Sequence, residues 1–295
     1  MKAAPFAYLR PGSLDEAVEL VAEVGDDDGK ILAGGQSLLP VLNLRLAHPA
    51  VLIDIAGLGE LRAIEPHGTG GGLTVGAMAT HRVLERGSSP ALAGFAPLSR
   101  VAELIGHLPI RTRGTIGGSL AHADSAAEWP LVALVLDCTI HALSRRGVRG
   151  IDANDFFEGP FSTALEPDEI LTGIHFPRPP HTLNVVEFAR RKGDFAIVAA
   201  ATVLGRRADR CEHARIAVGG VASTPVRIPE AEKVLEGCPL SDVHPAVLEA
   251  AYVCGETVDP PSDVHASSAY RKRLVRVLVE RALLRSHHDL EGTPS

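Results

Sequence analysis

The sequence lacks the short motifs by which many nucleotide-binding and hydrolytic proteins are identified. Its 295 residues contain no GxGxxG and no GxxxxGK[ST], which argues against a Rossmann fingerprint and a P-loop. They also contain no GxSxG elbow and no HExxH zinc motif. The thirteen histidines are scattered, so no metal site is expected. His122 stands out beside a glycine pair, but a loop histidine that bonds a backbone carbonyl is an equally good interpretation.

Cysteines and long apolar runs are also scarce. The four cysteines, Cys138, Cys211, Cys238 and Cys254, are far apart, which excludes a CxxC or iron–sulfur pattern. The start of the chain has no apolar signal-peptide core. We therefore expect buried free thiols in a reducing cytoplasm. No run approaches the roughly 18 apolar residues of a membrane-spanning helix, so none is expected.

An excess of basic charge is missing as well. The formal net charge is −7 and the isoelectric point is about 6.0. Nucleic acids and anionic membranes require a clustered basic surface, so neither is expected as a main partner. Apolar residues make up 45% of the chain but aromatics only 4%, so aliphatic side chains must fill the core. The length allows two or three domains.

Two glycine pairs carry most of the information that is present. The first lies in residues 33–37, AGGQS, and the second in residues 115–119, TIGGS. We expect both pairs on loops, where glycine allows positive φ and close approach of a ligand to the backbone. Successive N–H groups in such bends can form an anion-binding nest. Two nests with hydroxyl neighbours predict a diphosphate held from both sides, and thus a dinucleotide cofactor.

The N-terminal residues predict a small α/β unit ending near residue 58. Ser13 and Glu16 form a capping box that starts a helix, and Gly25 is expected to end it. Strands are expected at residues 30–33 and 51–55. A helix between strands favours an α/β unit.

The rest of the chain mixes helices and strands in an α+β pattern. Expected strands are 61–64, 73–75, 139–143, 170–176, 185–190 and 216–218. Expected helices are one capped by Thr80, one within 92–105 broken at Pro97, and those at 126–137, 230–235, 245–253 and 267–286. Residues 195–204 are apolar throughout and fit either a strand or a helix.

Three stretches together resemble a known family. Residues 33–40 read AGGQSLLP, residues 110–130 read IRTRGTIGGSLAHADSAAEWP, and residues 190–196 read RRKGDFA. In order and spacing they resemble the FAD-binding medium subunit of molybdenum hydroxylases. That family includes aerobic carbon monoxide dehydrogenase, nicotine dehydrogenase and the flavin domain of xanthine dehydrogenase. The resemblance covers nearly the whole chain.

The resemblance implies an α+β fold of the vanillyl-alcohol-oxidase type. Two N-terminal FAD-binding subdomains, residues 1–58 and 59–177, would be followed by a C-terminal α/β domain, residues 178–295. The cofactor-binding residues that it implies are Lys30, Ile31, Leu32, Ala33, Gly34, Gly35, Gln36, Ser37, Leu38, Gly106, Thr115, Gly117, Gly118, Ser119, Asp124, Glu128 and Leu171. Asp124 and Glu128 match positions on the ribose or adenine side, and Leu171 and Gly106 match positions beside the flavin ring.

The sequence departs from the family pattern at a few positions. Relatives usually carry asparagine where Thr112 stands and proline where Ser125 stands. They often carry lysine or tyrosine near the ring, where residues 185–187 are Val, Val and Glu. These differences leave open which groups contact the ring and which acceptor takes the electrons.

The resemblance implies an electron-transfer subunit with no catalytic acid, base or nucleophile of its own. A large molybdopterin subunit and a small subunit with [2Fe–2S] clusters would hold the other redox centres. The assembly is expected to be a cytoplasmic dimer of heterotrimers. Two alternatives remain at this stage: a stand-alone FAD-dependent oxidoreductase of the same fold, and a structural subunit that has lost FAD.

Overall fold

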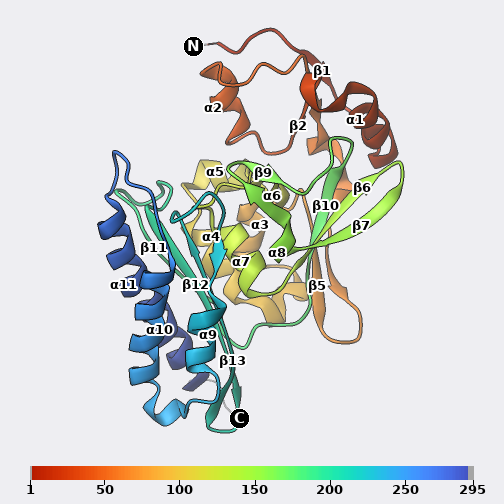
Figure 1. Cartoon of the computed structure of the whole chain (residues 1–295). Coiled ribbons are helices and arrows are strands. Elements are labelled where there is room, and N and C mark those ends of the chain that lie inside the picture. The colour runs from red at the N-terminus through yellow and green to blue at the C-terminus, as the bar shows by residue number, and fades with distance from the viewer. Residues whose placement is uncertain (1, 292–295) are drawn as a thin grey trace.

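The computed structural model describes residues 2–291, and for residues 25–27 it describes the backbone alone. Three larger sheets follow one another along the chain, each with its own helices (Figure 1). Helices and strands both contribute substantially, which confirms the α+β class. Within the described residues, no helix has the length and apolar character needed to cross a bilayer.

The N-terminal unit is a parallel three-stranded sheet in the order β1-β3-β2. Its elements are β1 (Ala7–Leu9), α1 (Leu14–Asp28), β2 (Gly29–Leu32), α2 (Leu38–Asn43) and β3 (Val51–Asp54). Ser13 caps α1, since its Oγ accepts a hydrogen bond from the N–H of Glu16 at 3.2 Å. The prediction that Gly25 ends this helix is wrong: α1 continues to Asp28, and β2 follows at once. A helical glycine costs only about 1 kcal/mol, which the packing of α1 on the sheet can offset.

The middle unit is an antiparallel five-stranded sheet in the order β4-β5-β10-β6-β7. Its strands are β4 (Ile64–His67), β5 (Gly72–Gly76), β6 (Thr139–Ser144), β7 (Gly147–Asp152) and β10 (Ile170–Phe176). Its helices are α3 (His81–Arg86), α4 (Pro97–Leu104), α5 (Leu108–Arg113), α6 (Ile116–His122), α7 (Glu128–Val135) and α8 (Ala153–Phe156). Short 3₁₀ helices span Ile55–Gly57, Gly59–Arg62 and Pro90–Phe95, and β8 (Phe157–Gly159) pairs with β9 (Ser162–Thr163).

Several predicted boundaries in this unit are confirmed. Thr80 caps α3, because its Oγ1 accepts from the N–H of Val83. Pro97 divides Pro90–Phe95 from α4, and Trp129 lies on α7.

The C-terminal unit is a four-stranded sheet in the order β11-β12-β13-β14. Its elements are β11 (Asn184–Phe188), β12 (Val198–Arg207), β13 (Arg210–Gly219), β14 (Val226–Arg227), α9 (Pro229–Leu235), a 3₁₀ helix (Leu240–Asp242), α10 (His244–Thr257) and α11 (Ser268–Glu291). All of its strand pairs are antiparallel. The four strands come before the three α-helices in the chain. The predicted α/β domain is thus α/β only in the sense that it contains both helices and strands.

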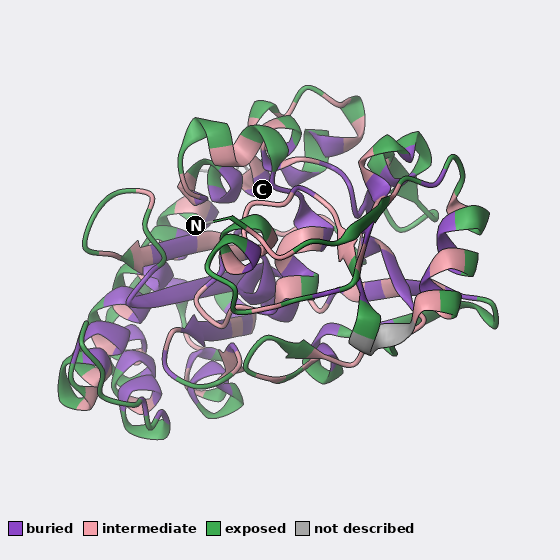
Figure 2. Ribbon diagram, turned by 90° about the horizontal axis from the view of Figure 1, so that it is seen from above, coloured by how far each residue is buried: buried purple, intermediate pink, exposed green. Residues whose placement is uncertain are grey.

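Strand β12 lies at the centre of this unit, and it settles the open assignment of residues 195–204 as strand from Val198 onward. Alternate side chains point to opposite faces of a strand. Val203 packs into the core shared with α7 of the middle unit, whereas Leu204 packs under the C-terminal helices. Buried residues gather in the interior and exposed residues on the outer surface (Figure 2), and strands β4 and β7 are largely exposed. We propose the division at residues 58 and 177, which the three successive sheets support.

All four cysteines are free. Cys138, Cys211 and Cys254 are buried as expected, but Cys238 is only partly buried, so the prediction of burial fails at that position.

Candidate cofactor site

The first glycine pair lies in a connection from strand to helix. We call residues 33–37 the first loop; it leaves the end of β2 and enters α2. β2 is an edge strand, with Ile31 and Leu32 partly buried and Lys30 exposed. Gly35 has φ +73°, a region that glycine adopts without strain.

The backbone N–H groups at this turn have no hydrogen-bond acceptor within the described residues. No hydrogen bond to any group of residues 2–291 is found for the five successive N–H groups from Gly34 to Leu38. The Ser37 hydroxyl precedes α2 but makes no capping bond. Gln36 turns back instead, and its Nε2 donates to the carbonyl of Gly34 at 3.1 Å. Backbone donors of folded proteins are nearly always paired, so five in a row together with a hydroxyl suit an anionic ligand.

The second glycine pair is not on a loop, contrary to our expectation. Gly117 and Gly118 lie in the first turn of α6, with Thr115 as the N-cap residue. The Thr115 Oγ1 accepts from the N–H of Gly118 at 3.0 Å, and the N–H of Gly117 donates to the carbonyl of Ala77 at 2.9 Å. Ser119 also donates its N–H within the chain, to the carbonyl of Thr115 at 3.0 Å. The predicted second nest of amides is therefore wrong, because these donors already have partners.

Gly117 has a packing role instead. A Cβ at this position would lie 2.5 Å from the Cβ of Ala77, well inside van der Waals contact. Glycine therefore lets α6 approach the chain after β5. The N–H of Ala77 in turn donates to the carbonyl of Thr172 at 2.9 Å, next to buried Leu171. The second segment (residues 113–119) is thus linked through Ala77 to the strand that carries Leu171.

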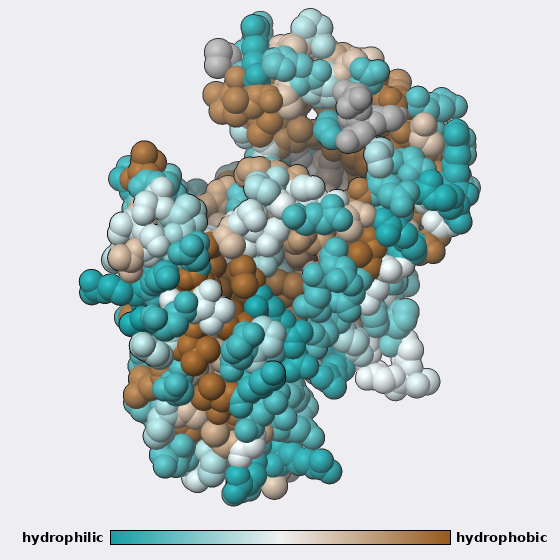
Figure 3. Space-filling model, viewed as in Figure 1, coloured by the Kyte–Doolittle hydropathy of each residue, from teal (hydrophilic) through white to brown (hydrophobic). Residues whose placement is uncertain are grey.

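The two glycine segments touch each other. A Cβ on Gly34 would lie 2.2 Å from the carbonyl oxygen of Arg113. A Cβ on Gly118 would lie 3.6 Å from the Cβ of Ala33. The first loop and the second segment therefore form one continuous wall at the junction of the N-terminal and middle units. Figure 3 shows a notch in the molecular outline between the N-terminal unit, at the top, and the C-terminal unit, at the lower left.

A buried histidine holds the second segment in place. The Trp129 Nε1 donates to the Nδ1 of His81 at 3.0 Å, and the N–H of His81 donates to the carbonyl of Gly114 at 3.0 Å. Burial, with a smaller contribution from Arg111, lowers the pKa of His81 to about 4, so the ring is neutral at pH 7. His81 is a residue that sequence reasoning missed as a support of this site.

The predicted acidic pair lies at the end of the middle unit that faces the C-terminal sheet. The Asp124 Oδ1 accepts from the N–H of Ala126 at 2.9 Å, and Glu128 begins α7. Burial, then Glu187 and more weakly Asp124, raise the pKa of Glu128 to about 8. Burial also raises the pKa of Glu187, on β11, to about 7. Sequence reasoning gave Glu187 no role, since no local pattern relates β11 to α7.

The two positions expected beside a ring system lie in separate elements. Gly106 has φ +49°, and its carbonyl accepts from Arg111 Nη1 at 2.9 Å. A Cβ on Gly193 would lie 2.5 Å from Cε1 of His107, the residue after Gly106. The stretch of residues 190–196 therefore lies beside this bend. Leu171 is buried at an irregularity in the β10–β6 pairing.

Comparison with known proteins identifies the family. Residues 4–179 match the FAD binding domain in molybdopterin dehydrogenase, and residues 185–286 match the CO dehydrogenase flavoprotein C-terminal domain. The chain belongs to the family of FAD-binding medium subunits of molybdenum hydroxylases. FAD is its cofactor, and it is a subunit of an oxidoreductase.

Individual relatives match over nearly their whole length. The nicotine 6-hydroxylase medium subunit of Paenarthrobacter nicotinovorans is 42% identical, with 96% of this chain and 98% of that protein covered. Quinoline 2-oxidoreductase from Pseudomonas putida 86 superposes with a TM-score of 0.90 at 37% identity, covering 98% of this chain and 99% of that one. Reconstituted CO dehydrogenase from Oligotropha carboxidovorans superposes with a TM-score of 0.92 at 34% identity, covering 98% of this chain and 100% of that one.

Proposed function

We propose that the chain binds FAD at the junction of its first loop and second segment. The free N–H groups of residues 34–38 and the Ser37 hydroxyl would bind the diphosphate. Thr115 and Gly117 would hold the second segment against the first loop, and Ser119 would offer a hydroxyl from α6. The close contact of Gly34 with Arg113 is the observation that carries this proposal, because it joins the two segments into one wall.

The other predicted residues would contact the remaining parts of the cofactor. Asp124 and Glu128 would face the ribose or adenine. Leu171 and the Gly106 bend would line the flavin ring, and Ile31 and Leu32 would cover apolar surface near the end of β2. When bound, FAD exchanges electrons singly or in pairs. No residue of this chain is assigned a role as acid, base or nucleophile.

In this role the chain would receive electrons from [2Fe–2S] clusters on a small partner subunit and pass them to an external acceptor. Substrate oxidation would occur on a large molybdopterin subunit. The relatives named as medium subunits or medium chains support this assignment. We propose a dimer of such heterotrimers in the cytoplasm.

Purification of the tagged chain from its native host tests this function. Our proposal predicts a yellow complex that contains two further chains, molybdenum and iron. The alternative, a stand-alone oxidoreductase, predicts FAD and substrate turnover in the chain by itself. Loss of the cofactor in a purely structural subunit predicts a colourless complex that takes up no added FAD.

A further inference from the structure

A pocket lies where α7 ends against the C-terminal sheet. It encloses about 190 Å³. Its residues come from α7 and the turn after it, from the proline-rich connection after β10, and from β12 and β13. They include apolar Val135, Leu136 and Val203 and charged or polar Arg178, His213 and Arg215. Glu128 begins α7, whereas Val135 ends it, so this pocket lies at the opposite end of the helix from the proposed cofactor site.

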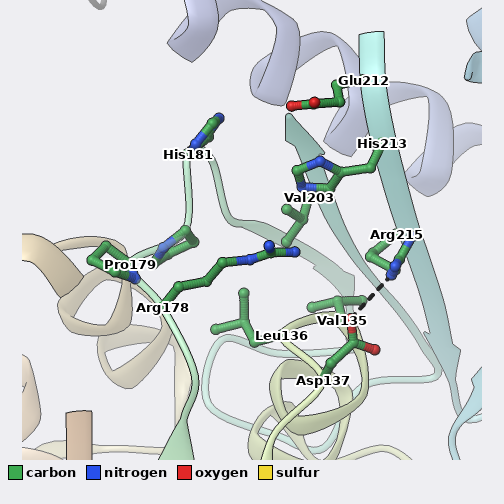
Figure 4. A pocket seen from close by; sticks show the side chains of 11 residues that line it. Val135, Leu136, Asp137, Arg178, Pro179, His181, Val203, Glu212, His213 and Arg215 are labelled. Carbon is green, nitrogen blue, oxygen red and sulfur yellow. Dashed lines mark hydrogen bonds and ion pairs between the residues drawn. The ribbon is translucent and has the colours of Figure 1, made fainter. Parts of the chain in front are cut away.

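Cationic side chains converge on this cavity. Figure 4 shows the Arg178 side chain extending into the pocket, with His213 on one side and Leu136 on the other. The rings of His181 and His213 are 6.0 Å apart. Burial lowers the pKa of His213, and the positive charges of Arg178 and Arg215 lower it further, followed by His181; Glu212 acts in the opposite direction.

The carboxylates around the pocket are already engaged. Asp137 accepts from Arg215 Nε at 3.2 Å and from Arg227 Nη1 at 2.8 Å. Arg227 also binds buried Glu232, with Nε to Oε1 at 2.9 Å.

The other acidic side chain that lines the pocket is Glu212, whose Oε1 lies 3.8 Å from Nη1 of Arg207. By contrast, no ion pair or hydrogen bond involving the Arg178 side chain is found anywhere in residues 2–291. Arg178, which is exposed at the mouth of the pocket, therefore has no counter-ion among the described residues.

The backbone is shaped to hold these groups in place. Gly205 pairs with His213 across β12 and β13, and a Cβ at 205 would lie 1.9 Å from the imidazole Cε1. Only glycine leaves room for the ring there. Pro179 and Pro180 follow Arg178, and their fixed φ restricts the connection that carries it.

We propose that this pocket binds a small oxyanion, either phosphate or the carboxylate of a small metabolite. The planar guanidinium of arginine matches both groups with two parallel hydrogen bonds. The imidazoles offer further donors, and a bound anion would give Arg178 the counter-ion that it lacks. Because Arg178 lies on the connection between the middle and C-terminal units, a bound anion would tie these units together.

Calorimetric titration of the purified full chain tests the proposal. Inorganic phosphate and succinate are titrated separately at constant ionic strength, with sodium chloride as the blank. Histidine NMR resonances are followed in parallel. We expect saturable binding of at least one anion, a shift of the His213 resonance, and a melting temperature that rises with anion concentration.

Variants locate the site. R178Q is expected to weaken binding about tenfold or more, whereas R178K retains part of the affinity. R273Q removes the same charge from an exposed position on α11 and should change nothing. Phosphate binding alone identifies a phosphate site, and succinate binding alone identifies a carboxylate site. Absence of binding by both anions in the millimolar range, or equal affinity in R178Q and the parent chain, would overturn the proposal.

Discussion

Gly34 lies against the main-chain carbonyl of Arg113, so closely that a Cβ on Gly34 would be 2.2 Å from that oxygen. This contact joins the first loop of the N-terminal unit to the second segment of the middle unit. The first loop supplies free N–H groups, and the second segment, anchored by Thr115, His81 and Ala77, supplies the surface against which that loop is held.

Substitution of Gly34 by alanine should separate the two segments. The added methyl group must displace backbone atoms of Arg113 and Gly114, which costs about 1–3 kcal/mol for overpacking. We expect purified G34A to lose most of its FAD, measured as flavin absorbance per chain after gel filtration. G59A is the matched control, because a Cβ at 59 meets nothing within 4 Å. Full flavin content in G34A would contradict the proposed junction.

Removal of the α6 cap tests whether the second segment supports the cofactor. T115V leaves the N–H of Gly118 without its acceptor, and loss of an N-cap costs about 1 kcal/mol. We expect a lower unfolding midpoint in urea together with weaker FAD binding. S13A removes the corresponding cap of α1 and should lower stability with FAD affinity unchanged. Similar FAD affinity in both variants would argue against a role for α6.

The His81–Trp129 hydrogen bond should stabilise the same segment. H81F removes the acceptor of the buried Trp129 N–H, at a cost of about 1–3 kcal/mol. Because the pKa of His81 is lowered to about 4 in the native state, native stability should fall as the pH drops from about 6.5 toward 4. H81F should lose that part of the pH dependence in urea unfolding. H48F, at an exposed position, serves as control; an unchanged profile in H81F would refute the assignment.

The Glu128–Glu187 pair should give the opposite pH dependence. With pKa values raised to about 8 and about 7, the native apoprotein retains protons that the unfolded chain releases near pH 4.5. Its stability should therefore decrease as the pH rises from about 5 to 8. The E128Q/E187Q double variant should flatten this decrease in urea unfolding measured across that range. E249Q, an exposed glutamate on α10, is the control, and an equally steep decrease in the double variant would contradict the account.

Local sequence signals predicted many of the helices and strands, but they missed others, such as β1, α5 and β7, and misplaced some ends. The Ser13–Glu16 capping box located the start of α1, and the strand expected at residues 170–176 is β10. Gly25 was a misleading stop signal, because packing overrides the modest penalty of a helical glycine. The Gly117–Gly118 pair likewise suggested a loop, because glycine is a weak helix former. Thr115, two residues before the pair, was nevertheless a signal for the start of a helix.

The candidate site could be predicted only in part. The free amides at Gly34 and Gly35 follow from a local turn, and glycine there was informative. The contact of Gly34 with Arg113 and the proximity of Glu128 to Glu187 join segments distant in sequence. Such contacts depend on how the units pack, which no local pattern encodes.

The most direct test of the central claim is a comparison of ligands on the apoprotein. If the free N–H groups of residues 34–38 bind a diphosphate, FAD should bind at least about a hundredfold more tightly than riboflavin, and ADP should compete with FAD. Flavin fluorescence quenching measures both. Equal affinity for FAD and riboflavin, with no competition by ADP, would contradict the account.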